Sequence, residues 1–228
     1  MTAYADPADP STILLVDLDG TVTDSFTGIA NSFRYALDAV GAPPAPDAVI
    51  AGVAGPPMID TLLGLGLDPA TADAAMAAYR ARYTEVGWLE NAVFDGMAAV
   101  LGDLAAGGRT LAIATSKNEN TAARILAHFG LDGYFRVIAG ASDDSTRRHK
   151  SDVIAHALAQ LGATIDPGTH RPDVPAVMIG DRSHDVSGAG RFGIPTIHVA
   201  WGYALPGESD AARWSVESPA DLREVLGV

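Results

Sequence analysis

Short runs of consecutive apolar residues recur along the chain, and segments with helical periodicity separate most of them. Continuous apolar runs of this kind are typical of strands that are buried on both faces. The runs cover residues 12–16, 110–114, 136–139, 176–179 and 196–199. Helical patterns cover residues 97–106, 118–129, 151–161 and 183–192. Strands that alternate with helices predict an α/β fold, with a parallel sheet joined by right-handed crossovers.

The segment between residues 24 and 94 breaks this alternation. It has helical patterns at residues 27–40, 58–65 and 71–86, interrupted by prolines, but no convincing strand. We interpret it as a helical insertion after the first strand. The predicted organisation is therefore a core of residues 1–23 and 95–228 that carries a helical unit of residues 24–94.

The balance of charges narrows the choice of partners. The chain has 28 Asp and Glu against 15 Lys and Arg, a formal net charge of −13. A field of that sign argues against nucleic acid or an anionic membrane surface as the main partner. Any site for an anion must be made locally positive, by a metal, helix N-termini or a few placed cations. Only two lysines occur, Lys117 and Lys150, which raises the question of what each of them does.

Cysteine is absent, which excludes disulfides and thiolate metal sites. The first residues are polar and lack the basic and apolar regions of a signal peptide. No apolar run reaches the roughly 18–20 residues needed to span a bilayer. We therefore expect a cytoplasmic protein without membrane segments, while the sequence leaves the oligomeric state open.

The first predicted strand ends in two carboxylates, at Asp17 and Asp19. Residues at i and i+2 of an extended chain point to the same side, so one carboxylate can attack phosphorus while the other handles the leaving group's proton. Gly20 permits a sharp turn that lets backbone N–H groups, including that of Thr21, face an anion. An acidic turn is the simpler interpretation of this segment taken alone.

Two later segments supply hydroxyl groups and a cation. Thr115 and Ser116 follow the second strand, and Ser116 has the capping-box spacing to Glu119, which predicts that a helix begins there. Such a helix N-terminus suits a phosphate, although Ser116 could serve only as a cap. Lys150 stands at the start of the next helical pattern, an unfavourable place for a cation beside the helix dipole, which suggests that it has another role.

A further carboxylate pair, Asp181 and Asp185, follows the fourth strand. Together with Asp17 these residues offer the hard oxygen ligands that Mg²⁺ takes in proteins. A Gly-Asp turn is the competing interpretation. Because ligands of open α/β sheets bind beyond the carboxyl ends of the strands, we expect all these side chains near one another.

Taken in order, these segments resemble the haloacid dehalogenase (HAD) superfamily of phosphatases. Its four motifs are an Asp-x-Asp-Gly-Thr, a strand-terminal Thr or Ser, a Lys and a Gly-Asp-x-x-x-Asp, and all four are intact between about Ile13 and Val199. Residues 54–57, 87–91, 149–154 and 201–203 look like the phosphoglycolate phosphatase-like branch, which includes proteins described as 5′-nucleotidases. The resemblance implies a Rossmann-like core and makes residues 24–94 the helical cap.

The resemblance also implies a mechanism. Asp17 would be the nucleophile that forms an aspartyl-phosphate, Asp19 would act as acid and then as base, and Lys150 would offset negative charge. Phosphate would be held by Gly20, Thr21, Thr115 and Ser116. Magnesium would be bound by Asp17, the backbone carbonyl of Asp19 and Asp181, with Asp185 acting directly or through a water molecule.

The leading hypothesis is a magnesium-dependent hydrolase of a small phosphorylated metabolite, with phosphoglycolate or a nucleoside monophosphate as the first substrates to try. Asp19 argues against dehalogenation, whose halide leaving group needs no proton, and the lack of lysine in residues 24–94 argues against phosphonate cleavage through a Schiff base. A sugar-phosphate mutase and an enzyme that transfers phosphate to or from protein tyrosine or serine stay open. A non-catalytic binding module fits the intact motifs poorly.

Substrate choice should lie in the cap. Its Lys and Arg residues are Arg34, Arg80 and Arg82, and one of them could pair with a carboxylate or a second phosphate. Tyr79, Tyr83 and Trp88 could stack on a base, but aromatic residues at helical spacing are more often core.

Overall fold

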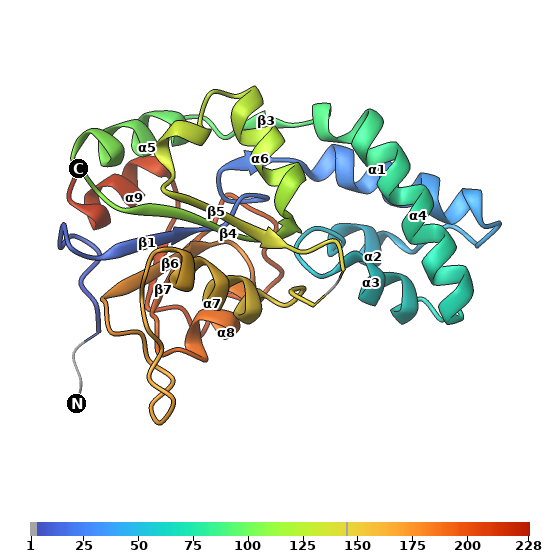
Figure 1. The fold of residues 1–228 in the computed structure, drawn as a ribbon. Helices are drawn as coiled ribbons and strands as arrows, with labels where there is room; N and C mark the ends of the chain where they lie inside the picture. Colours follow the sequence, from blue (N-terminus) through green and yellow to red (C-terminus); the bar gives the residue numbers. More distant parts are fainter. Residues whose placement is uncertain (1–3, 145) are drawn as a thin grey trace.

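A six-stranded, all-parallel sheet forms the centre of the protein (Figure 1). The structure is a computed structural model that describes residues 4–144 and 146–228. The strand order is β5-β4-β1-β6-β7-β8, so β1 lies in the middle and the chain adds strands first on one side of it and then on the other. The strands are β1 (Ile13–Val16), β4 (Leu111–Asn118), β5 (Val137–Ala141), β6 (Ala176–Gly180), β7 (Thr196–Val199) and β8 (Trp214–Val216).

Helices cover both faces of the sheet, which explains why the strands are apolar without alternation. In β1, Leu14 and Val16 face one helical layer, whereas Ile13 and Leu15 face the other. The first layer consists of α5 (Met97–Ala106), α6 (Glu119–His128) and α9 (Pro219–Leu226), and the second of α7 (Lys150–Gln160) and α8 (Ser183–Gly190). The predicted Rossmann-like α/β fold is confirmed.

The cap, residues 24–94, contributes its own apolar cluster beyond the end of the sheet. Its helices are α1 (Phe26–Ala39), α2 (Asp47–Ala51), α3 (Met58–Gly64) and α4 (Pro69–Glu85), followed by the short 3₁₀ helix η1 (Gly87–Leu89). Phe33, Leu37 and Leu62 are buried at the centre of this cluster. Figure 1 shows these helices gathered to one side of the core. The assignment of residues 24–94 to a separate unit stays a prediction.

Two predictions about the elements were wrong. The cap segment was expected to lack strands, but β2 (Thr23–Asp24) and β3 (Ala92–Val93) form a two-residue antiparallel ladder where the chain leaves and re-enters the core. The ladder is too short to leave a sequence pattern. In addition, α6 is capped by Asn118 rather than Ser116, and the Asn118 side chain accepts a hydrogen bond of 3.2 Å from the Thr121 N–H.

The reason for the second error lies in the sheet. Strand β4 continues past the predicted end at residue 114, because Asn118 still pairs with Ala141 of β5 after an irregularity in the register. Ser116 is therefore in a strand and cannot cap a helix. The C-terminal elements β8 and α9 were not predicted at all, because both are short.

Within the described residues, none of the helices has both the length and the apolar character needed to cross a bilayer. The cytoplasmic location stays a prediction.

Candidate active site

The carboxyl ends of the three central strands bring together side chains that lie far apart in the sequence. Strand β1 pairs with β4 through Val16 and Ile113 and with β6 through Val16 and Ile179. Asp17 follows Val16 directly, and Thr115 and Asp181 lie two residues beyond Ile113 and Ile179, so all three are placed at one edge of the sheet. This is the point where the strand order changes direction, the place where open α/β sheets bind ligands.

Three buried carboxylates meet at this edge. Asp17, Asp181 and Asp185 are 5%, 0% and 0% exposed, and each offers an oxygen within 4.8 Å of the others. Lys150, the first residue of α7 as predicted, is 5% exposed and places its Nζ 2.9 Å from Asp17 Oδ1 and 2.7 Å from Asp185 Oδ1. It also donates a hydrogen bond of 3.0 Å to the Ala114 carbonyl. The structure thus brings these four predicted residues together in one buried cluster.

The charges in this cluster do not balance. Burial raises the pKa of Asp17 to about 6 against the opposing effect of Lys150, and burial followed by the charge of Asp185 raises the pKa of Asp181. Burial acts to lower the pKa of Lys150, but Asp17 and Asp185 together raise it, so this residue is a cation. One ammonium faces three carboxylates. The donor set, all hard oxygen, fits a divalent cation such as Mg²⁺, which would supply the missing positive charge.

These pKa shifts predict how the stability of the metal-free protein depends on pH. Asp17 has an ordinary pKa of 3.8 and a folded-state pKa of about 6, so the folded protein binds its proton more tightly than the unfolded chain does. The free energy of unfolding should therefore fall as the pH rises through that interval. In a chelator, we expect a lower melting temperature at about pH 7.5 than at about pH 5.

Saturating Mg²⁺ should reduce this difference, because it stabilises the ionised carboxylates of the folded state only. In the Asp181→Asn variant without metal, the fall with pH should also be smaller. If the melting temperature in the chelator rose with pH in both the wild-type protein and the Asp181→Asn variant, the carboxylates of this cluster would not have raised pKa values.

The turn after Asp17 is shaped around Asp181. Gly20 has a φ of +83°, and the Thr21 hydroxyl, which is buried, donates a hydrogen bond of 3.3 Å to Asp181 Oδ1. The N–H groups of Gly20 and Thr21 donate to the carbonyls of Thr23 and Leu18. These contacts hold the loop together, and a role of the two residues in phosphate binding stays a prediction.

A single methyl group should disrupt this turn. In Gly20→Ala the new Cβ would lie 2.2 Å from Asp181 Oδ2. The alanine would also have to adopt a positive φ, which is unfavourable for a residue with a side chain. Gly41→Ala is a matched control, because Gly41 also has a positive φ, +66°, but nothing lies within 4 Å of a Cβ there. We expect the control to lose about 1 kcal/mol of stability and Gly20→Ala to lose about 3 kcal/mol or more, measured by urea denaturation. Equal losses would show that the close approach to Asp181 is unimportant.

Asp19 lies beside the carboxylate cluster with both of its oxygens occupied. The Ser25 hydroxyl donates a hydrogen bond of 2.5 Å to Oδ1, and Lys117 Nζ lies 2.7 Å from Oδ2. The same Nζ lies 4.6 Å from the centre of the Tyr83 ring, which comes from the cap. In the sequence, Lys117 is notable only as one of two lysines, and no pattern gives it a role. Its position next to the second predicted catalytic carboxylate is new information from the fold.

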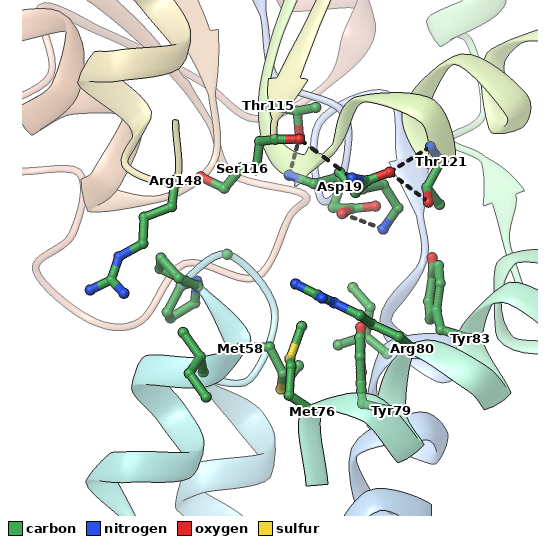
Figure 2. Close-up of a pocket in the computed structure, with 18 of the residues that line it drawn as sticks. Asp19, Met58, Met76, Tyr79, Arg80, Tyr83, Thr115, Ser116, Thr121 and Arg148 are labelled. Atoms are coloured by element: carbon green, nitrogen blue, oxygen red, sulfur yellow. Dashed lines mark hydrogen bonds and ion pairs between the residues drawn. The ribbon is translucent and has the colours of Figure 1, made fainter. Parts of the chain in front are cut away.

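Thr115 and Ser116 lie on the same side of the site. Thr115 is buried, and its hydroxyl accepts a hydrogen bond of 3.2 Å from the Lys117 N–H. Ser116 is partly exposed to a cavity (Figure 2). Both residues line the same cavity as Asp17, and their role in phosphate binding stays a prediction.

A cavity of about 640 Å³ separates this edge of the sheet from the cap. Its core side includes Asp17, Asp19 and Ser116, and its cap side includes apolar residues together with Tyr79 and Arg80. The apolar part of the cap wall is formed by Ile29, Val53, Met58, Ile59 and Met76. A space this large can hold a leaving group of considerable size against an apolar wall.

The three cap arginines, whose roles the sequence could not distinguish, have different environments in the structure. Arg82 forms a 3.0 Å ion pair with Glu90 and donates to the Ser32 hydroxyl, so it stabilises the cap. Arg80 lines the cavity, whereas Arg34 does not belong to its lining. Arg148 is a further cation in the lining that was not predicted, and it pairs with Asp60 of α3 at 3.1 Å.

The aromatic residues of the cap also differ from one another. Tyr79 and Tyr83 stack at 5.6 Å between ring centres and both line the cavity. Trp88 lies outside the lining and packs under the Arg124 guanidinium, whose Cζ is 3.7 Å from its ring centre.

Next to the carboxylate cluster, Arg182 joins the core to the cap. Its guanidinium pairs with Glu208 at 2.7 Å and donates to the Ala54 carbonyl in the cap. His184 is half-buried, and burial lowers its pKa. Arg182 therefore fixes the loop that carries Asp181 and does not itself face the cavity lining.

A parallel α/β core, a buried carboxylate and lysine cluster at its central strand ends and a helical cap over a cavity together define an enzyme of the phosphatase class. The chain belongs to the haloacid dehalogenase-like hydrolase family, whose model matches residues 14–199. The resemblance seen in the sequence motifs is thereby confirmed.

Three proteins of known name or structure are similar to this chain over most of its length. The tyrosine-protein kinase PtkA of Mycobacterium tuberculosis is 47% identical over 97% of this chain and 75% of its own length, and its solved structure gives a TM-score of 0.78. A 5′-nucleotidase of Pseudomonas aeruginosa is 38% identical over 93% of this chain and 94% of its own length. A crystal structure described as a predicted phosphatase from Clostridium acetobutylicum is 34% identical, covers 96% of this chain and 99% of its own, and gives a TM-score of 0.86.

Proposed function

We propose that the protein is a magnesium-dependent phosphomonoesterase that hydrolyses a small phosphorylated metabolite through an aspartyl-phosphate on Asp17. One observation carries the proposal. A buried carboxylate at the end of the central strand contacts a buried lysine and opens onto a cavity under the cap. A buried site in which a lysine, together with a bound metal ion, would offset the negative charge favours phosphoryl transfer, in which positioning and charge neutralisation supply most of the catalysis.

The first step forms a bond between an Asp17 carboxylate oxygen and phosphorus, while the bond from phosphorus to the leaving oxygen breaks. Asp19 donates a proton to that oxygen, which leaves as an alcohol. In the second step Asp19 takes a proton from water as the water oxygen attacks phosphorus, and the bond to Asp17 breaks. Inorganic phosphate is released and both carboxylates return to their starting forms.

The remaining groups act by position and charge. Lys150 holds Asp17 in place and offsets its charge, and the hydroxyls of Thr115 and Ser116 are available to the phosphoryl oxygens. Mg²⁺ bound by Asp17, Asp181, Asp185 and the Asp19 carbonyl would neutralise charge on the phosphate. With the metal and Lys150 in the site, a net charge of −13 is no obstacle to an anionic substrate.

The first substrates to test are phosphoglycolate and nucleoside monophosphates. The cavity of about 640 Å³ and its apolar cap wall support a nucleoside monophosphate, the larger of the two. The likeness to a relative named 5′-nucleotidase supports it too. Arg80 in the lining supports a leaving group that carries negative charge.

A panel of phosphomonoesters, assayed for phosphate release with and without Mg²⁺, tests the proposal. We expect release from at least one member, dependent on Mg²⁺. Absence of release from every member would refute a small-molecule phosphatase. Isomerised sugar phosphate with little free phosphate would instead indicate a mutase.

A second candidate is phosphoryl transfer to protein tyrosine, and the 47% identity to a protein named tyrosine-protein kinase favours it. In that reaction Asp17 would take the γ-phosphoryl group of ATP as the bond to ADP breaks. An acceptor tyrosine would replace water in the second step and lose its proton to Asp19. Label from γ-³²P-ATP on protein tyrosine, absent in Asp17→Asn, would support this candidate; label found only in inorganic phosphate would argue against it.

A further inference from the structure

Tyr83 of α4 carries a buried hydroxyl without a hydrogen-bond partner. The residue is 5% exposed, and its Oη has no hydrogen-bond partner within normal distance among the described residues, although the ammonium group of Lys117 lies close to it. Several other buried polar atoms in the described part of the chain also lack partners, but their residues do not line the cavity, whereas Tyr83 does. Among these unpartnered groups of the described residues, the Tyr83 hydroxyl is the one whose residue borders the cavity.

The ring that carries the hydroxyl is held on several sides. Tyr79 stacks on it with an angle of 14° between the planes, and Lys117 Nζ lies 4.6 Å from its centre. The backbone of Gly87 approaches so closely that a Cβ there would lie 2.9 Å from Tyr83 Cδ2. Figure 2 shows the hydroxyl directed toward the side of the cavity where Asp19 lies. Its direction is fixed by packing rather than by a hydrogen bond.

Burial of an unpartnered hydroxyl is unfavourable, because the group loses its hydrogen bonds to water and gains none in return. Phenylalanine would fill the same space and keep the ring contacts without that cost. A tyrosine at this position is therefore expected to gain a partner in another state of the enzyme, and the cavity is the space from which a partner can come.

The geometry of the proposed reaction identifies that partner. In an in-line displacement the leaving oxygen departs on the side of phosphorus opposite to the nucleophile. With Asp17 on the core side, the leaving group extends toward the cap. Lys117, which pairs with Asp19 Oδ2 and contacts the Tyr83 ring, connects the predicted acid to this tyrosine. The Tyr83 hydroxyl thus points toward the side of the cavity where the first atoms of the leaving group would lie.

We propose that Tyr83 is a specificity-determining residue, whose hydroxyl donates a hydrogen bond to an oxygen of the leaving group close to the scissile ester. The preferred substrates are then phosphate esters of leaving groups that carry oxygen next to the ester, such as hydroxy acids, sugars or nucleosides. Aryl phosphates, which lack such an oxygen, gain nothing from this residue. The inference rests on the proposed phosphomonoesterase function.

Tyr83→Phe tests it in two measurements. For the best oxygen-rich substrate of the panel, we expect kcat/KM to fall roughly 10-fold, the effect of losing one hydrogen bond in a site that excludes water. For p-nitrophenyl phosphate we expect no change. The melting temperature of the free protein should stay the same or rise, because the hydroxyl has no partner to lose. A residue with a purely structural role would instead lower the melting temperature and affect both substrates alike.

Tyr35→Phe is the matched control, since Tyr35 lies on the outer surface of the cap with 51% exposure. It should leave all three quantities unchanged. If Tyr83→Phe had the wild-type kcat/KM on both substrates, the inference would be overturned. A loss of kcat/KM of the same size on both substrates would overturn it as well. Neither result affects the proposed function, which fails only if the wild-type protein releases phosphate from no member of the panel.

Discussion

Asp17→Asn is expected to reduce phosphate release by roughly 10⁴-fold or more, in effect to background. The asparagine keeps the size of the side chain, but its amide oxygen is a poor nucleophile and cannot form the acyl phosphate that the reaction requires. The fold should survive, because a buried group whose pKa is raised to about 6 is replaced by one that needs no charge compensation. Without metal, we therefore expect an unchanged or higher melting temperature.

Steady-state phosphate release and thermal unfolding of the same preparation test both parts. Asp38→Asn is the control, since Asp38 is exposed on α1, away from the cavity lining, and should behave as wild type. Retained activity in Asp17→Asn would rule out the proposed nucleophile. Loss of activity together with loss of folded protein would assign a structural role to Asp17 instead.

Lys150→Met is expected to have the largest effect on stability. It removes the cation that contacts Asp17 at 2.9 Å and Asp185 at 2.7 Å, together with a hydrogen bond to the Ala114 carbonyl. Breaking a buried ion pair typically costs 3–5 kcal/mol, so in the absence of metal we expect a loss of about that size in urea denaturation. Phosphate release should fall by roughly 10³-fold, because the nucleophile loses its positioning partner.

Two further variants separate charge from packing. Adding Asp185→Asn to Lys150→Met should restore part of the stability, because one uncompensated buried charge is removed, but should not restore activity. Lys117→Met offers a comparison with the other lysine, whose partner Asp19 is 12% exposed at its side chain. We expect a smaller loss of stability there. If Lys150→Met proved as stable as wild type, the carboxylates would not depend on this lysine.

The position of the strand-end residues in the fold could be predicted, because it follows from the short stretch of sequence that precedes each of them. A strand buried on both faces is recognisable from its composition, and the positions after it, such as Asp17 and Asp181, necessarily lie at one edge of a parallel sheet. Lys150 could be assigned only through the family resemblance, since its contact with Asp17 joins residues on different elements. The end of β4 was misplaced because pairing of Asn118 with Ala141 is a long-range effect.

The cap resisted prediction for a related reason. Arg80 and Arg82 are two residues apart on α4, so they face different directions, but the sequence does not show which direction is the cavity. Glu90, beyond the end of the helix, pairs with Arg82 and so distinguishes it from Arg80. The orphan hydroxyl of Tyr83 likewise has no signature in the sequence, because the lack of a partner is a property of packing.

The two-residue ladder between β2 and β3 has a consequence for how such enzymes diversify. Because Thr23 pairs with Val93 and Asp24 with Ala92, the chain leaves the core and returns to it at a single place. The entropy of closing a loop grows only slowly with its length. Segments of different size and shape can therefore be exchanged between these two points at little cost to the sheet. Recognition of the leaving group can then evolve separately from the phosphoryl chemistry, which stays with the core.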